Sequence, residues 1–389
     1  MALKFAERLR VVQPMKRGHL VLVVLLLTFT GAHATGRWTE ARANAWYRHQ
    51  PWLIGANYIP ANSINQLEMW QNATFDPARI DIELGWAESV GMNTVRVFLH
   101  DLVWQQDKAT FKKRISRFLS IADKHNIRTI FVLFDSCWNP DPKLGPQQPP
   151  KAGVHNSGWV QAPGAAALLD PRQYPRLEAY VEGVVGAFAQ DRRVLAWDLW
   201  NEPDNTNDAS YASLEPANKL ALVQTLLPRV FEWARSADPI QPLTSGVRRD
   251  ALPPLQAQSP IARIQIENSD IISFHNYDVP ELFERQIEAL KRYDRPIICT
   301  EYMARGLGST FEGILPIARR TRVAAINWGL VAGKTQTFLP WDSWKTPYVG
   351  REPALWFHDV FQTDGTPYRA DEVRLLRQLT NTAKPRAEK

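Results

Sequence analysis

The sequence predicts a closed (β/α)₈ barrel, the TIM-barrel class of α/β folds. Eight short apolar runs alternate with amphipathic stretches along the chain. Most of the runs are almost continuously apolar, which is typical of parallel strands that are buried on both faces. Eight strands that alternate with helices over about 340 residues fit one barrel with long loops.

The expected strands are Trp52–Tyr58, Asn93–Leu99, Arg128–Phe134, Val194–Trp200, Gln241–Val247, Ile271–Phe274, Pro296–Tyr302 and Val323–Trp328. Helix signals lie between them. Asp76 and Pro77 are typical of a helix start, and Gly91 of its end. Two further stretches, 177–188 and 220–234, carry apolar residues at helical spacing.

A doubly wound open sheet is the alternative fold. Such sheets usually carry a glycine-rich phosphate-binding turn after the first strand. The segment that follows the first expected strand reads Asn57-Tyr58-Ile59-Pro60 and has no such turn.

The first 34 residues are expected to be a signal peptide. Lys16-Arg17 precedes an apolar run over 20–27, and Ala32-His33-Ala34 forms an A-x-A-like cleavage site. The apolar run is shorter than the ~20 residues that span a bilayer, although an uncleaved anchor is the alternative. We therefore expect residues 35–389 to be a single catalytic barrel domain, exported to the periplasm or secreted. Translation could begin at Met1 or at Met15.

Composition excludes some classes of partner and cofactor. The net charge is +6, but the leader holds five Lys/Arg and one acidic residue, which leaves 41 basic and 39 acidic residues for the rest. This balance gives no case for a nucleic-acid partner, which would need a basic stripe on the domain. Cys137 and Cys299 have no metal-binding spacing and are expected to be free thiols, so we expect neither a metal nor another cofactor.

Polar and aromatic residues gather where the expected strands end. In such barrels the active site lies at the carboxyl ends of the strands. The residues at or just after those ends are Arg96, Asp135, Asn201, Glu202, His275, Tyr277, Glu301 and Trp328. Glu202 and Glu301 follow strands four and seven, so they would face each other across the barrel mouth. Glycosidic cleavage needs such a pair, one carboxyl to protonate the leaving oxygen and one to meet the oxocarbenium-like transition state.

Several segments resemble glycoside hydrolase clan A, and family 5 cellulase-like enzymes in particular. Trp197–Pro203 ends in Asn-Glu-Pro and resembles the strand-four motif, and Ile297–Tyr302 resembles the strand-seven segment that carries the nucleophile. His275-Asn276-Tyr277 is similar to the strand-six His-x-Tyr motif. Arg96 and Trp328 match the strand-two arginine and the strand-eight tryptophan. The resemblance covers the whole mature chain in the expected order.

The resemblance implies a retaining glycoside hydrolase that cleaves a β-linked oligo- or polysaccharide through a covalent glycosyl-enzyme intermediate. Glu202 would be the general acid/base. Glu301 would be the nucleophile, oriented by Arg96 and Tyr277. The two carboxyl groups would lie ~5–5.5 Å apart.

The remaining roles also follow from the resemblance. Asn201 would bind the sugar 2-hydroxyl, His275 would tune the acid/base, and Trp328 would stack under the sugar. A transglycosylase or a non-catalytic sugar-binding barrel on the same scaffold is the alternative function.

One departure from the family pattern concerns strand three, which in the family often ends in Asp-x-His. Here the triplet is Asp135-Ser136-Cys137, so Cys137 replaces a sugar-binding group, and we expect Trp138 to take over by stacking. The loop over 139–171 is rich in Pro, Gly and Gln and is expected on the active face. Trp341 and Trp344 follow strand eight and are expected to line the same cleft.

Overall fold

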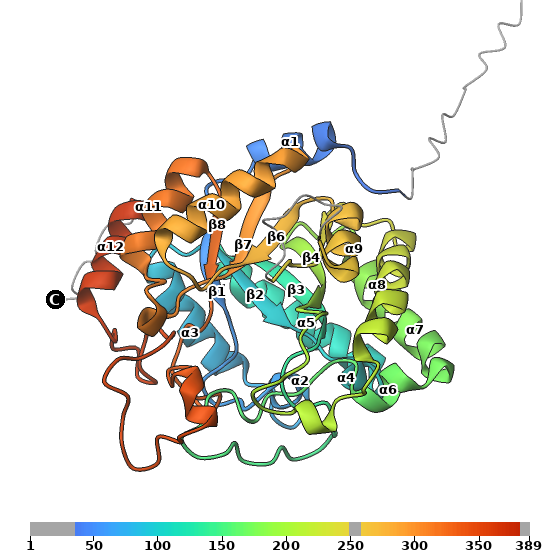
Figure 1. The fold of residues 1–389 in the computed structure, drawn as a ribbon, viewed down its shortest axis with the longest axis horizontal. Helices are drawn as coiled ribbons and strands as arrows, with labels where there is room; N and C mark the ends of the chain where they lie inside the picture. The colour runs from blue at the N-terminus through green and yellow to red at the C-terminus, as the bar shows by residue number, and fades with distance from the viewer. Residues whose placement is uncertain (1–35, 249–257, 382–389) are drawn as a thin grey trace, which may run out of the picture. The chain divides into compact units, whose positions relative to one another are not determined.

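All eight expected strands form in the computed structural model, which describes residues 36–248 and 258–381. They are β1 (Ile54–Asn57), β2 (Thr94–Phe98), β3 (Arg128–Asp135), β4 (Val194–Asn201), β5 (Leu243–Thr244), β6 (Ile272–His275), β7 (Ile297–Glu301) and β8 (Ala324–Asn327). The strands pair in parallel in the order β5-β4-β3-β2-β1-β8-β7-β6 (Figure 1). The expected signal peptide, 1–34, lies outside the described residues and stays a prediction.

The ring of strands closes between β5 and β6. Strand β5 is shorter than expected, because Ser245 donates its N–H to the side chain of Ser269 (3.2 Å) and its hydroxyl to the Trp200 carbonyl (2.8 Å) instead of continuing the strand. Val247 then forms a parallel bridge with Phe274 of β6. This closure confirms the TIM barrel and makes the open-sheet alternative wrong.

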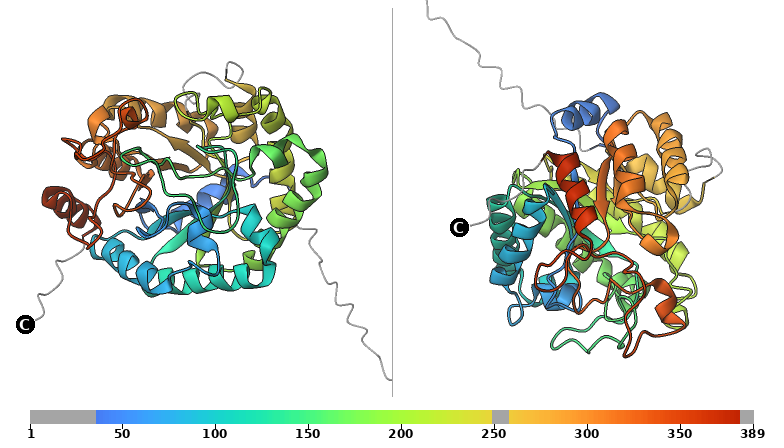
Figure 2. Two further views of the ribbon diagram at one scale, coloured as in Figure 1. Left: turned by 90° about the horizontal axis from the view of Figure 1, so that it is seen from below. Right: turned by 90° about the vertical axis from the view of Figure 1, so that its left-hand side faces the viewer.

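Most of the described helices form an outer ring around the strands (Figure 2, left), whereas α1 (Glu40–Arg48) lies across one end of the barrel. The other described α-helices are α2 (Gln66–Trp70), α3 (Pro77–Ser89), α4 (Asp101–Gln106), α5 (Lys108–Lys124), α6 (Ala165–Leu169), α7 (Tyr174–Phe188), α8 (Lys219–Ser236), α9 (Pro260–Asn268), α10 (Pro280–Leu290), α11 (Phe311–Thr321) and α12 (Ala370–Thr380). As expected, α3 begins after Asp76, whose carboxylate accepts from Arg79 N, with Pro77 in its first turn. The two other expected helices lie within α7 and α8. None of the described helices is long and apolar enough to cross a membrane.

The two ends of the barrel differ in chemistry. At the amino end, apolar side chains including Leu53, Leu195 and Ile271 fill the interior, and Trp46 and Tyr47 of α1 pack against them. The long loops that follow β3 and β8 lie on the opposite side from α1, at the lower edge of Figure 1. Because apolar packing and α1 close the amino end, the carboxyl end is left for polar residues.

We predict that the layer of aromatic side chains between strands and helices carries much of the stability. Phe131 of β3 is fully buried, with ring centroids 6.2 Å from Phe118 and 5.8 Å from Trp197. Phe131→Ala should lower the free energy of unfolding by about 3–5 kcal/mol, because a cavity replaces the ring. Urea denaturation measures this loss. Ile82→Ala on α3, where the side chain is 52% exposed, serves as the control and should change stability by no more than about 0.5 kcal/mol. Equal small losses for both variants would contradict the packing account.

Candidate active site

Two glutamates meet at the carboxyl end of the barrel. Glu202 directly follows β4, and Glu301 is the last residue of β7. Both are buried, with 8% and 5% of their surface exposed. One carboxylate oxygen of each and a ring nitrogen of His275 all lie within 4.8 Å of one another.

Glu301 is held by two donors. Arg96 Nη1 donates to its Oε1 and the Tyr277 hydroxyl donates to its Oε2, each at 2.8 Å. A guanidinium and a phenol are the groups expected to orient this carboxylate, so the structure brings together the contacts that the sequence predicted.

Arg96 is fully buried and its guanidinium serves four acceptors. Besides Glu301, it donates to Asp198 Oδ2 from Nε (3.0 Å) and Nη2 (2.8 Å) and to Asn201 Oδ1 (2.7 Å). It also donates to Asn57 Oδ1 (2.8 Å). Burial lowers the pKa of Arg96, but the charges of Asp198 and Glu301 outweigh burial and raise it, so the guanidinium stays cationic.

Glu202 has a different set of neighbours. Its Oε1 lies 2.9 Å from His275 Nδ1, and its Oε2 accepts from Asn205 Nδ2 (2.7 Å) and from the Cys137 thiol (3.4 Å). Arg248 Nε lies 3.9 Å from the same Oε2. Glu202 is therefore held by an imidazole, an amide and a thiol, whereas Glu301 is held by a guanidinium and a phenol.

His275 lies between the two carboxylates, with Nδ1 also 3.4 Å from Glu301 Oε2. Burial lowers the pKa of His275, but the charge of Glu301 and the hydrogen bond and charge of Glu202 outweigh it and raise this pKa. Burial raises the pKa of Glu202, yet the hydrogen bond and charge of His275, followed by the charge of Arg248, lower it to about 2. The pKa of Glu301 is raised, because burial outweighs the charges of His275 and Arg96, which lower it. These shifts favour an ionised Glu202 and a protonated imidazole at His275 in the free protein.

The backbone is strained at several strand ends around these groups. Trp138, Glu202 and Met303 have positive φ values of 69°, 42° and 82°, which residues other than glycine rarely adopt. They follow β3, β4 and β7 respectively. Strain of this kind costs free energy and persists mostly at functional sites, which supports placing the site here.

A cleft of about 700 Å³ opens above the two glutamates, a volume within the usual range of ligand sites. The predicted residues that line it are Trp138, Asn201, Glu202, His275, Tyr277, Glu301, Trp328, Trp341 and Trp344. Arg96 and Asp135 do not line the cleft and lie beneath it. Asp135 accepts from Asn201 Nδ2 (2.9 Å) and Trp159 Nε1 (2.6 Å), so it positions Asn201 rather than meeting a ligand.

Other lining residues were not singled out from the sequence, among them Arg248, Asn205 and Asn156. Asn205 lies three residues after Glu202, so the strand-four motif could have suggested it. Arg248 follows the expected fifth strand and could have been found by its position at a strand end. Asn156 lies deep in a long loop, and no local pattern marks it.

Glu202, His275 and Glu301 are close enough for one divalent cation. Their facing atoms already accept hydrogen bonds or ion pairs from Arg96, Tyr277 and Asn205. Two guanidinium groups beside the cluster also oppose a cation. The donor set therefore fits proton and sugar chemistry better than metal binding.

The two cysteines are free thiols, as the sequence predicted. Cys137 occupies the place expected from the strand-three triplet. Its sulfur lies 3.4 Å from Glu202 Oε2 and 3.4 Å from Asn201 Nδ2. Burial and the charges of Asp135 and Glu202 raise its pKa well above the ordinary value, so it acts as a neutral thiol.

No protein-family model matches the sequence, and no curated protein matches it. Solved structures do match the fold. A variant of GH5_18 from Streptomyces cattleya in complex with Manβ1-4GlcNAc is 14% identical with a TM-score of 0.58, over 86% of this chain and 82% of that chain. The exo-β-1,4-mannosidase Op5Man5 from Opitutaceae bacterium strain TAV5 is 20% identical with a TM-score of 0.56, over 85% of this chain and 60% of that chain.

A β-1,4-mannanase from the sea hare Aplysia kurodai is 16% identical with a TM-score of 0.51, over 71% of this chain and 87% of that chain. At these identities the likeness shows a shared barrel fold.

We predict that the pKa of His275 lies above its ordinary value of 6.5, because two carboxylates face its Nδ1. NMR titration of isotope-labelled histidine would measure this pKa. Glu202→Gln should lower it, since the variant removes one negative charge. Glu232→Gln, which alters an exposed residue of α8, should leave it unchanged. A wild-type value below 6.5, or no response to Glu202→Gln, would contradict the proton assignment.

Proposed function

We propose that the chain is a retaining glycoside hydrolase that cleaves a β-linked glycan through a covalent glycosyl-enzyme intermediate. The observation that carries this proposal is the pair of buried glutamates at the barrel mouth, with carboxylate oxygens within 4.8 Å of each other. Retaining enzymes hold their two carboxyl groups ~5–5.5 Å apart, whereas inverting enzymes need ~6.5–9.5 Å to admit a water molecule.

Glu301 is the nucleophile in this proposal. Arg96 and Tyr277 fix both of its oxygens, and Arg96 favours the anionic form. In the first step a Glu301 oxygen forms a bond to the anomeric carbon while the bond from that carbon to the leaving oxygen breaks. Glu202 gives its proton to the leaving oxygen in the same step.

The proton on Glu202 comes from His275 along their 2.9 Å hydrogen bond. Once the imidazole is neutral, it no longer lowers the pKa of Glu202, so the carboxyl can hold a proton in a closed site. In the second step Glu202 takes a proton from water, which attacks the anomeric carbon and releases Glu301. The reaction needs no cofactor.

The walls of the cleft suit a sugar ring. Trp138, Trp328 and Trp341 line the cleft, and indole faces pack well against the C–H faces of sugars. Asn201 directly precedes Glu202 and lines the same cleft, as expected for a group that binds the 2-hydroxyl. An exo-β-1,4-mannosidase and a β-1,4-mannanase are among the solved structures with this fold, so β-mannosides are the first substrates to test.

We predict that the two glutamate variants fail in different ways. Glu301→Gln removes the nucleophile and should abolish turnover of every β-glycoside. Glu202→Ala should lower kcat by about 10²–10⁴-fold for glycosides with poor leaving groups. Activated aryl glycosides leave without protonation, so their first step should survive, and azide should restore turnover with a product of retained configuration. Release of the aryl group and NMR of the product measure these effects.

Glu232→Gln on the exposed face of α8 is the matched control and should behave as the wild type. Near-normal activity of both active-site variants would refute the assignment. A wild-type product of inverted configuration would refute the retaining mechanism. Sugar transfer to an added acceptor, in excess over hydrolysis, would favour the transglycosylase alternative.

A further inference from the structure

The cleft is asymmetric around the barrel axis. Its described lining residues come from the segments that follow β3 to β8, including Trp138, Glu202, Arg248, Tyr277 and Trp341. Among the described residues, none that follows β1 or β2 lines it. Something therefore covers the β1–β2 side of the mouth.

Three aromatic side chains form part of this cover. The ring centroids of Phe98 and Trp159 are 5.2 Å apart, those of Phe98 and Trp328 are 5.7 Å apart, and those of Trp159 and Trp328 are 6.0 Å apart. Trp328 lines the cleft on one side and a separate cavity on the other. We call these three residues the aromatic partition.

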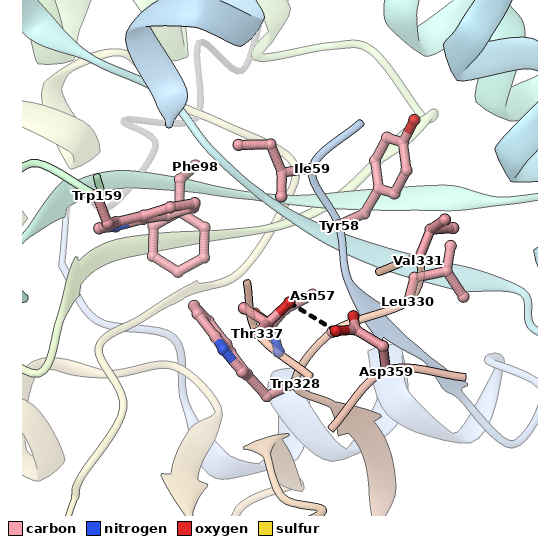
Figure 3. Close-up of a pocket in the computed structure, with 11 residues that line it drawn as sticks. Asn57, Tyr58, Ile59, Phe98, Trp159, Trp328, Leu330, Val331, Thr337 and Asp359 are labelled. Carbon is pink, nitrogen blue, oxygen red and sulfur yellow. Dashed lines mark hydrogen bonds between the residues drawn. The ribbon is translucent and has the colours of Figure 1, made fainter. Parts of the chain in front are cut away.

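The cavity behind the aromatic partition is small. Figure 3 shows the partition residues together on one side of it and Tyr58, Leu330 and Asp359 on the other. Its volume is about 20 Å³, enough for about one water molecule and far too little for a sugar. The mouth is therefore filled above β1 and β2.

Two loops complete the cover. They are residues 151–156, which follow β3, and residues 335–348, which follow β8, and they are hydrogen-bonded to each other. Among the hydrogen bonds between them are those from Gly153 N to Gln336 Oε1 (2.8 Å), Tyr348 N to Gly153 O (2.8 Å), Asn156 N to Thr335 O (2.9 Å) and His155 N to Ser343 Oγ (2.9 Å). Trp138 and Trp344 stack beneath them, with centroids 5.3 Å apart and planes at 9°. A Cβ at Gly153 would lie 2.5 Å from the Tyr348 carbonyl carbon, so only glycine permits this approach. We call this the loop bridge.

The opposite side of the cleft reaches solvent through the segments after β4 and β7. Asp208 and Ala209 line the cleft there and are exposed, and Leu307 is 48% exposed. Glu202 Oε2 lies on this side of the cleft, where it contacts Asn205 and Arg248. A general acid must contact the leaving oxygen, so the leaving part of a glycan extends toward this open side.

The sugar whose anomeric carbon Glu301 attacks therefore lies on the other side of the cleft, which the aromatic partition and the loop bridge close. Asn156 of the loop bridge lines this part of the cleft and is fully buried, with φ of 51°. Neither its amide oxygen nor its amide nitrogen has a hydrogen-bond partner among the described residues. Burying both atoms unpaired costs free energy, and a pair of sugar hydroxyls would satisfy them.

We propose that the enzyme is exo-acting, removing one sugar at a time from the non-reducing end, and that Asn156 is a binding residue for that terminal sugar. The inference rests on the proposed function. The aromatic partition and the loop bridge close the cleft beside the sugar that Glu301 attacks, so a glycan cannot continue beyond that sugar, and the open side accepts the rest of the glycan.

A pair of substrates tests this directly: 4-nitrophenyl β-1,4-mannotrioside and the same compound blocked at O4 and O6 of its terminal sugar by a benzylidene acetal. Chromatography should show a monosaccharide as the only first sugar product from the free compound. The blocked compound should react at least about 100-fold more slowly, because the acetal does not fit the closed end. Cleavage of the blocked compound at a similar rate, or release of a disaccharide first, would overturn the inference.

Failure of the proposed function gives a different result. If the free trioside and 4-nitrophenyl β-glucoside, β-galactoside and β-mannoside all remain uncut by the wild type, the hydrolase assignment itself fails, and the exo-acting inference fails with it.

Asn156→Gly tests the binding residue, since glycine keeps the positive φ and removes the amide. We expect kcat/KM on the best substrate to fall about tenfold, the value of one lost hydrogen bond. Inhibition by the free monosaccharide should weaken in parallel. Asn126→Gly, at an exposed turn with φ of 58°, is the matched control and should leave both unchanged. A lower melting temperature for Asn156→Gly with unchanged kinetics would show a purely structural role and overturn this part.

Discussion

The buried guanidinium of Arg96 is the interaction on which the site depends. It lies on β2 and bonds to residues of β1, β4 and β7 at once, through Asn57, Asp198 and Glu301. A buried cation is costly unless it is fully paired, and removal of one partner leaves an uncompensated charge. The network therefore ties strands together across the barrel interior, because any shift of β7 relative to β2 would break a charged hydrogen bond.

The contact with Arg96 also makes Glu301 chemically different from Glu202. Glu301 bonds to a permanent cation and a phenol, whereas Glu202 bonds to an imidazole, an amide and a thiol. Two carboxyl groups with such different neighbours differ in pKa, and in the proposed function they take different roles, Glu301 as the nucleophile and Glu202 as the acid/base. His275 lies between the two carboxylates, and in the proposed mechanism its proton passes to Glu202.

The sequence predicted the barrel well because its parallel strands are buried on both faces and read as apolar runs. It also predicted that Glu202, Glu301, His275 and Tyr277 meet, because strand ends in a barrel share one mouth. The boundaries of β5 were less predictable, since Ser245 leaves the strand for side-chain partners that only the tertiary structure supplies. Asp135 was expected at the barrel mouth in a substrate-binding or supporting role, yet its position at a strand end did not reveal that Trp159 would bond to it.

The loops were the least predictable part. Nothing near Asn156 in the sequence indicates that residues almost 180 positions later would hold it at the cleft. Gly153 illustrates the reason, because its lack of a side chain matters only through its contact with Tyr348. Contacts between loops that are far apart in the sequence decide which end of the cleft is closed, and local sequence patterns do not predict such contacts.

The covalent intermediate is the central claim, and trapping it is the most direct test. In a glycoside, fluorine at carbon 2 slows both steps because it destabilises their oxocarbenium-like transition states, and an activated leaving group speeds only the first step, so the intermediate accumulates. After incubation with such glycosides of mannose, glucose and galactose, mass spectrometry should find the intact protein heavier by one fluorosugar. The peptide that contains Glu301 should carry the added mass, and Glu301→Gln should remain unlabelled. Turnover of the parent glycoside without any label on the protein, or a label on Glu202, would contradict the account.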